Sequence, residues 1–164
     1  MENNKLASDK QTNVCITTHK NELKMTFITE RDSNGVQNGL EKVLWSNGSL
    51  CRLGHYKNGK KDGRFISFFP FSKFRQSTEI GIDEIVYFKN DLADGRFYNF
   101  YENGHLEHIQ DWKAGHISGN AYYFDTKQRL ICIEHYGKNN SVAGYVCYDT
   151  LGNVSKRQGE ITFR

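Results

Sequence analysis

The sequence lacks long apolar runs and any concentration of charge of one sign. Its 164 residues include a single proline, and the formal net charge is only +3, with Lys and Arg scattered among acidic residues. No run approaches the length needed to span a bilayer, and the opening MENNKLASDKQTN has no apolar core of a signal peptide. Nucleic-acid binders usually concentrate basic residues on one stripe. We therefore expect a cytoplasmic protein that binds no nucleic acid and has little tendency to bind membranes.

The sequence also lacks paired cysteines and the common catalytic motifs. Cys15, Cys51, Cys132 and Cys147 lie far apart and form no CxxC pair. Zinc sites need close, paired ligands, and without a secretion signal free thiols are favoured over disulfides. No nucleophile elbow, phosphate-binding glycine loop or HExxH is present. We predict four reduced thiols, no metal, no cofactor and no enzymatic activity.

Aromatic residues and glycine, in contrast, are abundant. The chain has 11 Phe, 9 Tyr and 15 Gly. Aromatic side chains pack well on a pleated sheet and glycine supplies tight turns. No segment shows an apolar stripe with the helical period of about 3.6 residues. The composition therefore predicts an all-β protein.

An internal repeat organises the chain. LWSNGSLCRLGHYKNGKKDGRFISFF aligns with FYENGHLEHIQDWKAGHISGNAYYF, with glycines and apolar residues at identical spacings. The glycines that end each unit follow one another at 24, 32, 24 and 25 residues, so one unit is longer by about eight. They are Gly39, Gly63, Gly95, Gly119 and Gly144. We count about five units.

Each unit predicts a β-hairpin. Asn-Gly between apolar runs is a strong hairpin signal, and we assign type I′ turns to Asn47-Gly48 and Asn103-Gly104. The second glycine pair of each unit, such as Gly59 and Gly63, indicates a slightly longer connection. Because one hairpin cannot bury its apolar face, successive units must stack. We predict an elongated antiparallel sheet of stacked hairpins over 15–164, with an insertion at about 68–78 and a polar, partly disordered segment at 1–14.

The motifs YENGHL, HYKNGKKDG and QDWKAGHISG resemble MORN repeats, and more closely the longer repeat of the YwqK-type antitoxin family. The resemblance covers the chain from about Asn21 to its C-terminus. The short MORN consensus has a further glycine two residues after the unit-ending one, where this chain has Phe65, Phe97, Ala121 and Val146. The resemblance implies an immunity protein that neutralises a cognate toxin by direct binding.

Three histidines, His105, His108 and His116, lie within one unit beside acidic residues. Alternation along a strand places His105 and His108 on opposite faces, and His116 follows the next turn. A hydrolase that uses His105 and Glu107 is therefore disfavoured, and we interpret these histidines as ordinary strand and turn residues.

Two features could bind a protein partner. The insertion contains Pro70, which interrupts a strand, and alternates aromatic with basic residues, the composition of interface hot spots. The strands carry rings on both faces, more than one sheet layer can cover. The predicted partner-binding residues are Phe69, Phe71, Lys73, Phe74, Arg75, Tyr98 and Tyr122.

An alternative function is a MORN-like scaffold that associates with anionic membrane surfaces or a larger assembly. Its support is a mildly basic zone near aromatic residues: Lys57, Lys60, Lys61, Arg64, Lys73 and Arg75. The open sheet also leaves edge strands that could pair two chains into a homodimer.

Overall fold

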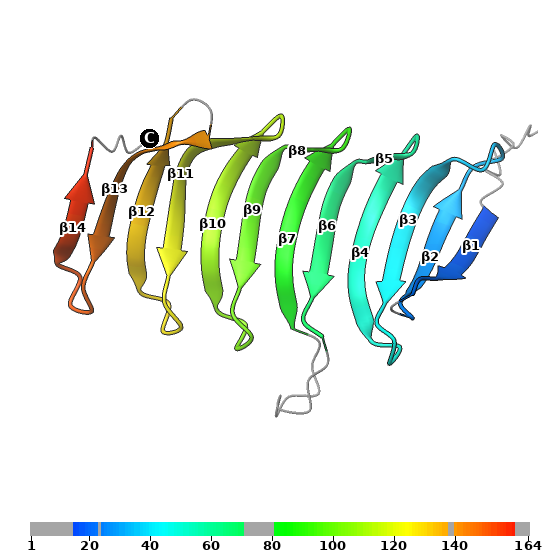
Figure 1. The fold of residues 1–164 in the computed structure, drawn as a ribbon, viewed down its shortest axis with the longest axis horizontal. Helices are drawn as coiled ribbons and strands as arrows, with labels where there is room; N and C mark the ends of the chain where they lie inside the picture. Colours follow the sequence, from blue (N-terminus) through cyan, green and yellow to red (C-terminus); the bar gives the residue numbers. More distant parts are fainter. Residues whose placement is uncertain (1–14, 23, 71–80, 138–139, 160–164) are drawn as a thin grey trace, which may run out of the picture.

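The computed structural model describes residues 15–22, 24–70, 81–137 and 140–159. These form one open sheet of 14 strands, in which the strands lie beside one another in sequence order (Figure 1). The predicted all-β sheet of stacked hairpins is confirmed. The N-terminal segment 1–14 and positions 71–78 of the insertion lie outside the described residues.

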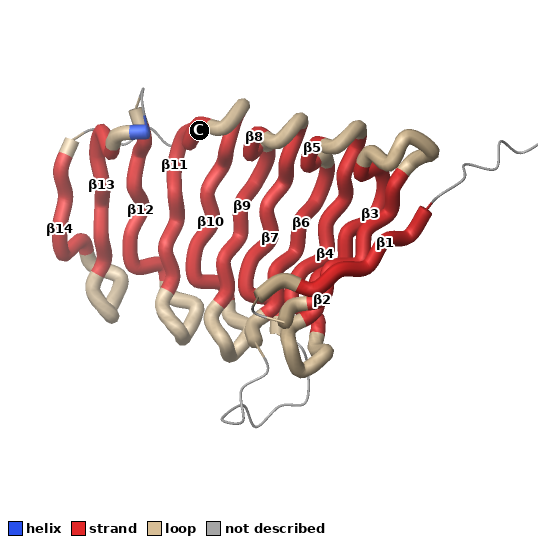
Figure 2. Tube along the Cα trace, turned by 45° about the vertical axis from the view of Figure 1, so that its right-hand side comes forward, coloured by secondary structure: helices blue, strands red, loops and turns tan. Residues whose placement is uncertain are grey.

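Every neighbouring pair of strands is antiparallel, and two short strands, β5 and β8, pair alongside β4 and β7. The strands are β1 (Cys15–Lys20), β2 (Thr26–Arg31), β3 (Gln37–Leu44), β4 (Leu50–Lys57), β5 (Lys60–Lys61), β6 (Gly63–Phe68), β7 (Ile82–Lys89), β8 (Leu92–Ala93), β9 (Gly95–Phe100), β10 (Leu106–Lys113), β11 (His116–Phe124), β12 (Leu130–Tyr136), β13 (Val142–Tyr148) and β14 (Val154–Gln158). The sheet is twisted, so that β1 and β2 run obliquely to β13 and β14 (Figure 2).

The repeat glycines and aromatic residues meet across the strands. Four of the five unit-ending glycines lie opposite the repeat's aromatic residue on the neighbouring strand, in the pairs Gly39–Tyr56, Gly63–Phe88, Gly95–Trp112 and Gly119–Tyr136, whereas Gly144 lies opposite His135. Gly63 has φ 100° and Gly95 has φ 131°, values that side-chain-bearing residues rarely adopt. The repeat in the sequence is therefore a repeated cross-strand pair.

The turns of the lower edge in Figure 1 differ from our prediction. At Asn47-Gly48 only the glycine has positive φ, and Gly48 N–H donates to Trp45 O at 2.9 Å while Trp45 N–H donates to Ser49 O at 2.8 Å. The Tyr101–His105 turn repeats this pattern at Gly104. These are three-residue loops with one left-handed residue, so the type I′ assignment was wrong there.

The two-residue turns lie on the opposite edge. Asn58-Gly59 and Ala114-Gly115 have positive φ at both positions, 52° and 78° in the first and 48° and 80° in the second. They join Lys57 to Lys60 and Lys113 to His116 directly. Both positive φ values fit a type I′ turn, the geometry that we had assigned to the other edge. The connection at Gly59, which we expected to be the longer of the two in its unit, is therefore the shorter one.

Both sheet faces are built from alternating residues of a single layer, and no described segment packs over either face. The face that we call the first face holds the most buried apolar side chains, Val43, Phe65 and Ala121, with relative exposures of 1%, 3% and 0%. Buried polar Glu41 and Gln110 share it, and Glu41 is paired with Arg52 at 2.7 Å. The opposite, second face buries Ile133 and Val146. The core therefore consists of side chains that lie side by side on neighbouring strands of a single sheet layer.

A disulfide joins two neighbouring strands. Cys132 of β12 lies directly opposite Cys147 of β13, with a Cα–Cα distance of 4.0 Å, and their sulfurs are bonded. Our prediction that all four thiols are reduced was therefore wrong for this pair. The strand register brings together two cysteines that are 15 residues apart in sequence. Cys51 is free, and burial raises the pKa of its thiol.

Candidate binding surface

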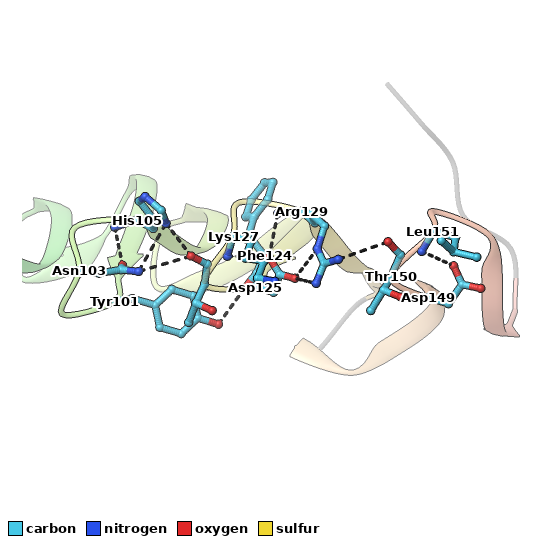
Figure 3. Close-up of polar contacts among 11 residues, drawn as sticks. Tyr101, Asn103, His105, Phe124, Asp125, Lys127, Arg129, Asp149, Thr150 and Leu151 are labelled. Atoms are coloured by element: carbon cyan, nitrogen blue, oxygen red, sulfur yellow. Dashed lines mark hydrogen bonds and ion pairs between the residues drawn. The ribbon is translucent and has the colours of Figure 1, made fainter.

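The three histidines of the clearest repeat unit lie apart. His105 sits in the turn before β10, where its Nδ1 donates to Thr126 O at 2.6 Å (Figure 3). His108 lies on the first face, stacked against Tyr123. His116 is exposed at the start of β11. Among the described residues, no group of three His, Cys, Asp or Glu side chains could hold a metal ion.

Side chains at the lower edge bind the next turn along the sheet. Tyr101 Oη donates to Phe124 O at 2.8 Å, and Arg129 Nη1 donates to Thr150 O at 3.3 Å (Figure 3). Within its own turn, Asp125 accepts the backbone N–H of Arg129 at 2.9 Å and pairs with the guanidinium. These hydrogen bonds, the backbone N–H first, lower the pKa of Asp125. This polar edge therefore has a structural role.

A polar cluster on the first face also holds strands together. Tyr123 Oη and Tyr136 Oη both donate to Glu134 Oε2, at 3.0 and 2.8 Å. Burial, followed by side-chain hydrogen bonding of Tyr123 with Tyr136 and Glu134, raises the pKa of Tyr123 well above its ordinary value. Burial lowers the pKa of His108, whose Nε2 is buried with no hydrogen-bond partner among the described residues. The cluster bridges β10, β11 and β12.

On the second face, two of the predicted binding residues come together. Tyr98 of β9 and Tyr122 of β11 each lie directly opposite Ile109 of β10. With strands about 4.8 Å apart, the two tyrosines stand about 10 Å from each other on the same face. We call Tyr98, Ile109 and Tyr122 the tyrosine row. All three are half-buried, and further apolar residues extend the row through Ile85, Ile66 and Leu53 on one side and Ile133 and Val146 on the other.

A polar hollow of about 520 Å³ adjoins the tyrosine row. It is lined by Arg96, Asp111, Ser118, Gly119, Asn120, Tyr122 and His135. It forms where the pairing of β10 with β11 jumps from Gln110–Ala121 to Asp111–Ser118, which inserts extra residues into β11. Ser118 and Gly119 carry little or no side chain, so this stretch leaves space above the sheet.

Two polar pairs flank the hollow. Arg96 Nε and Nη2 donate to the two carboxylate oxygens of Asp111 at 2.9 and 3.3 Å. The carboxylate, and to a smaller extent Tyr98, raises the pKa of Arg96. Across the hollow, His135 Nδ1 lies 2.8 Å from Asn120 Oδ1. Sequence reasoning missed this site, although Arg96 and Asn120 both directly follow a unit-ending glycine.

The remaining predicted binding residues belong to the insertion. Phe69 follows β6 at the lower edge, where its N–H donates to Gly81 O at 3.0 Å, so it does not share the tyrosine row. The other four, Phe71, Lys73, Phe74 and Arg75, lie outside the described residues.

Comparison with known proteins returned no matching protein-family model and no matching curated protein. In the described part of the chain, no helix has the length and apolar character that crossing a membrane requires.

Proposed function

We propose that this chain is a non-catalytic protein-binding module and that it acts as an immunity protein, neutralising a cognate toxin by direct binding. The observation that supports binding most directly is the tyrosine row, because no described segment packs over it. The toxin assignment is supported by the repeat motifs and their resemblance to YwqK-type antitoxins.

The chemistry of this face suits a protein interface. Tyr, Ile and Arg combine on it, and the energetics of interfaces are dominated by aromatic and Arg side chains around an apolar centre. Tyr98 and Tyr122 lie on paired strands opposite Ile109, so the backbone that carries them is already ordered before a partner binds. Arg96 and Asp111, with side chains 54% and 45% exposed, border the row.

Co-expression tests this proposal. The chain is produced together with the products of the genes that flank its own, and growth rescue and co-purification are measured. We expect Tyr98→Ala/Tyr122→Ala to weaken binding at least about thirtyfold, the effect of losing a hot spot. Tyr87→Ala is the control, because Tyr87 is an exposed tyrosine that pairs with Arg64 outside the row. A folded double variant that binds and rescues as well as the parent would overturn the proposal.

One observation favours the alternative, a scaffold at anionic membrane surfaces. Lys57, Lys60, Lys89 and Lys113 are all exposed at the type I′ edge, while Asp94 is occupied by Ala114 N–H and Lys113. Co-sedimentation with anionic vesicles separates the two functions. Salt-sensitive binding that is lost in Lys57→Gln/Lys60→Gln would support the scaffold.

A further inference from the structure

From the geometry of the polar hollow we infer the chemistry of the partner that would occupy it. We propose that the hollow receives a carboxylate side chain, Asp or Glu, of the partner, while an apolar side chain two positions away lies on the tyrosine row. This inference rests on the proposed function, since it assigns the partner's recognition element.

Hydrogen-bond donors remain available around the hollow. Arg96 has five N–H groups, of which Asp111 takes two and Tyr98 engages another, so the guanidinium retains donors for a further acceptor. The hydroxyls of Ser118 and Tyr122 add further donors. The Asn120 amide donates to Tyr122 Oη at 3.5 Å, which directs its Oδ1 toward His135. A ligand that brings oxygen acceptors therefore suits the lining.

The accessible guanidinium of Arg96 is the feature that suits a carboxylate. Asp111 is the single acidic residue that lines the hollow, and it is already neutralised by the bidentate contact with Arg96. Arg96 is about half exposed, so a second carboxylate can reach it from solvent. Planar guanidinium groups bind carboxylates in this way, and charge-assisted hydrogen bonds are stronger than neutral ones.

The separation of Arg96 and Tyr98 on the sheet determines how far apart the two recognised side chains of the partner must be. Arg96 and Tyr98 are two residues apart on β9 and lie on the same face, a separation of about 7 Å. In an extended partner segment, side chains at positions i and i+2 lie on the same face at the same separation. The expected recognition element is therefore an apolar residue followed or preceded by an acidic residue two positions away.

A pair of short peptides tests this inference without the partner. Nuclear magnetic resonance titration of the full chain compares acetyl-Phe-Ala-Glu-amide with acetyl-Phe-Ala-Gln-amide. We expect saturable shifts on β9 to β12 with the Glu peptide and at least about fivefold weaker binding of the Gln peptide, because the charge-assisted bonds are lost. No saturable shift up to about 10 mM, or equal binding of both peptides, would overturn the inference.

Two variants with opposite expected effects separate recognition from folding. Arg96→Gln should abolish the preference for the Glu peptide, whereas Asp111→Asn should strengthen Glu peptide binding, because it removes the carboxylate that competes for Arg96. Arg64→Gln is the matched control, since Arg64 follows a unit-ending glycine like Arg96 but lies opposite Tyr87. Unchanged selectivity in Arg96→Gln, or weaker binding in Asp111→Asn, would contradict the inference.

The two proposals can fail separately. If the neighbour-encoded partner binds through Tyr98 and Tyr122 and Arg96→Gln has no effect, then acidic recognition is wrong while the binding module stands. If the Glu peptide binds selectively but the neighbour-encoded protein does not bind, the toxin assignment is wrong.

Discussion

The imidazole of His108 lies flat against the phenol ring of Tyr123, with ring centroids 4.5 Å apart and an interplanar angle of 3°. Phe97 meets the other side of His108 edge-on at 5.5 Å. A histidine in this position behaves as an aromatic core residue, and its titration is tied to folding.

Acid should destabilise the protein through His108. Burial lowers the pKa of the folded-state imidazole, so the unfolded chain binds the extra proton first. The stabilising effect of the neutral ring is fully present above the unfolded pKa of about 6.5 and is lost as pH falls below it, by at most about 1.4 kcal/mol per pH unit for one proton. Urea unfolding at several pH values should show a shallower acid slope in His108→Phe. His116→Phe, at an exposed site, should keep the parent slope, and an unchanged slope in His108→Phe would refute this account.

Alkali should destabilise the protein through Tyr123. Burial raises the pKa of its phenol, so the stability that the neutral phenol provides is present below the unfolded pKa of about 10 and is lost as pH rises above it. Tyr123→Phe should flatten this alkaline loss and, at neutral pH, cost about 1–2 kcal/mol through the missing hydrogen bond to Glu134. Spectrophotometric titration beside urea unfolding measures both effects. Equal alkaline sensitivity of parent and variant would show that other groups, such as Tyr136, dominate.

The Cys132–Cys147 bond should contribute measurably to stability. With a sequence separation of 15 residues between the paired cysteines, the loop-closure estimate is about 3 kcal/mol. Cys132→Ser/Cys147→Ser should lower the free energy of unfolding by about 2–4 kcal/mol, and dithiothreitol should weaken the parent but not the variant. Cys51→Ser is the control, because Cys51 is a free thiol. A parent protein insensitive to reductant would mean that the bond adds no stability.

Gly54 should tolerate no side chain. A Cβ at this position would fall within the ring of Phe65, which is only 3% exposed and cannot move away. We expect Gly54→Ala to cost more than about 2 kcal/mol by overpacking. Gly137→Ala is the comparison, because its Cβ would meet Ala143 Cβ at 3.4 Å, an ordinary contact. Thermal unfolding of both variants decides the matter, and similar melting temperatures would contradict the packing argument.

The sequence contains the repeat, and the repeat determined most of the fold. The spacing of Gly63 and Gly95 predicted stacked hairpins. In the structure each of these glycines lies opposite an aromatic residue of the neighbouring strand. The repeat could not determine the turn types, since an Asn-Gly pair fits both a two-residue loop and the end of a three-residue loop. The choice between them depends on the register of the flanking strands, which no dipeptide encodes.

The surface was only partly predictable for a related reason. Tyr98 and Tyr122 share a face because strict alternation applies along β9 and β11 up to the bulge. The hollow beside them lies at the two-residue register shift near Gly119. The same shift recurs near Gly63 and Gly95, so it belongs to the repeat, and the side chains that line the hollow are what distinguish this unit. The disulfide was not predicted because Cys132 and Cys147 are far apart in sequence. Strand pairing between β12 and β13 places them directly opposite each other.

The sequence-ordered pairing of strands gives this molecule an unusual folding geometry. Nearly every contact joins a strand to the strand before or after it, so few distant parts of the chain must find each other. Structure can therefore grow outward from any one hairpin and melt inward from either end, as in a one-dimensional array. The disulfide between β12 and β13 keeps these two strands joined when β14 separates, so we expect unravelling from that end to be opposed there.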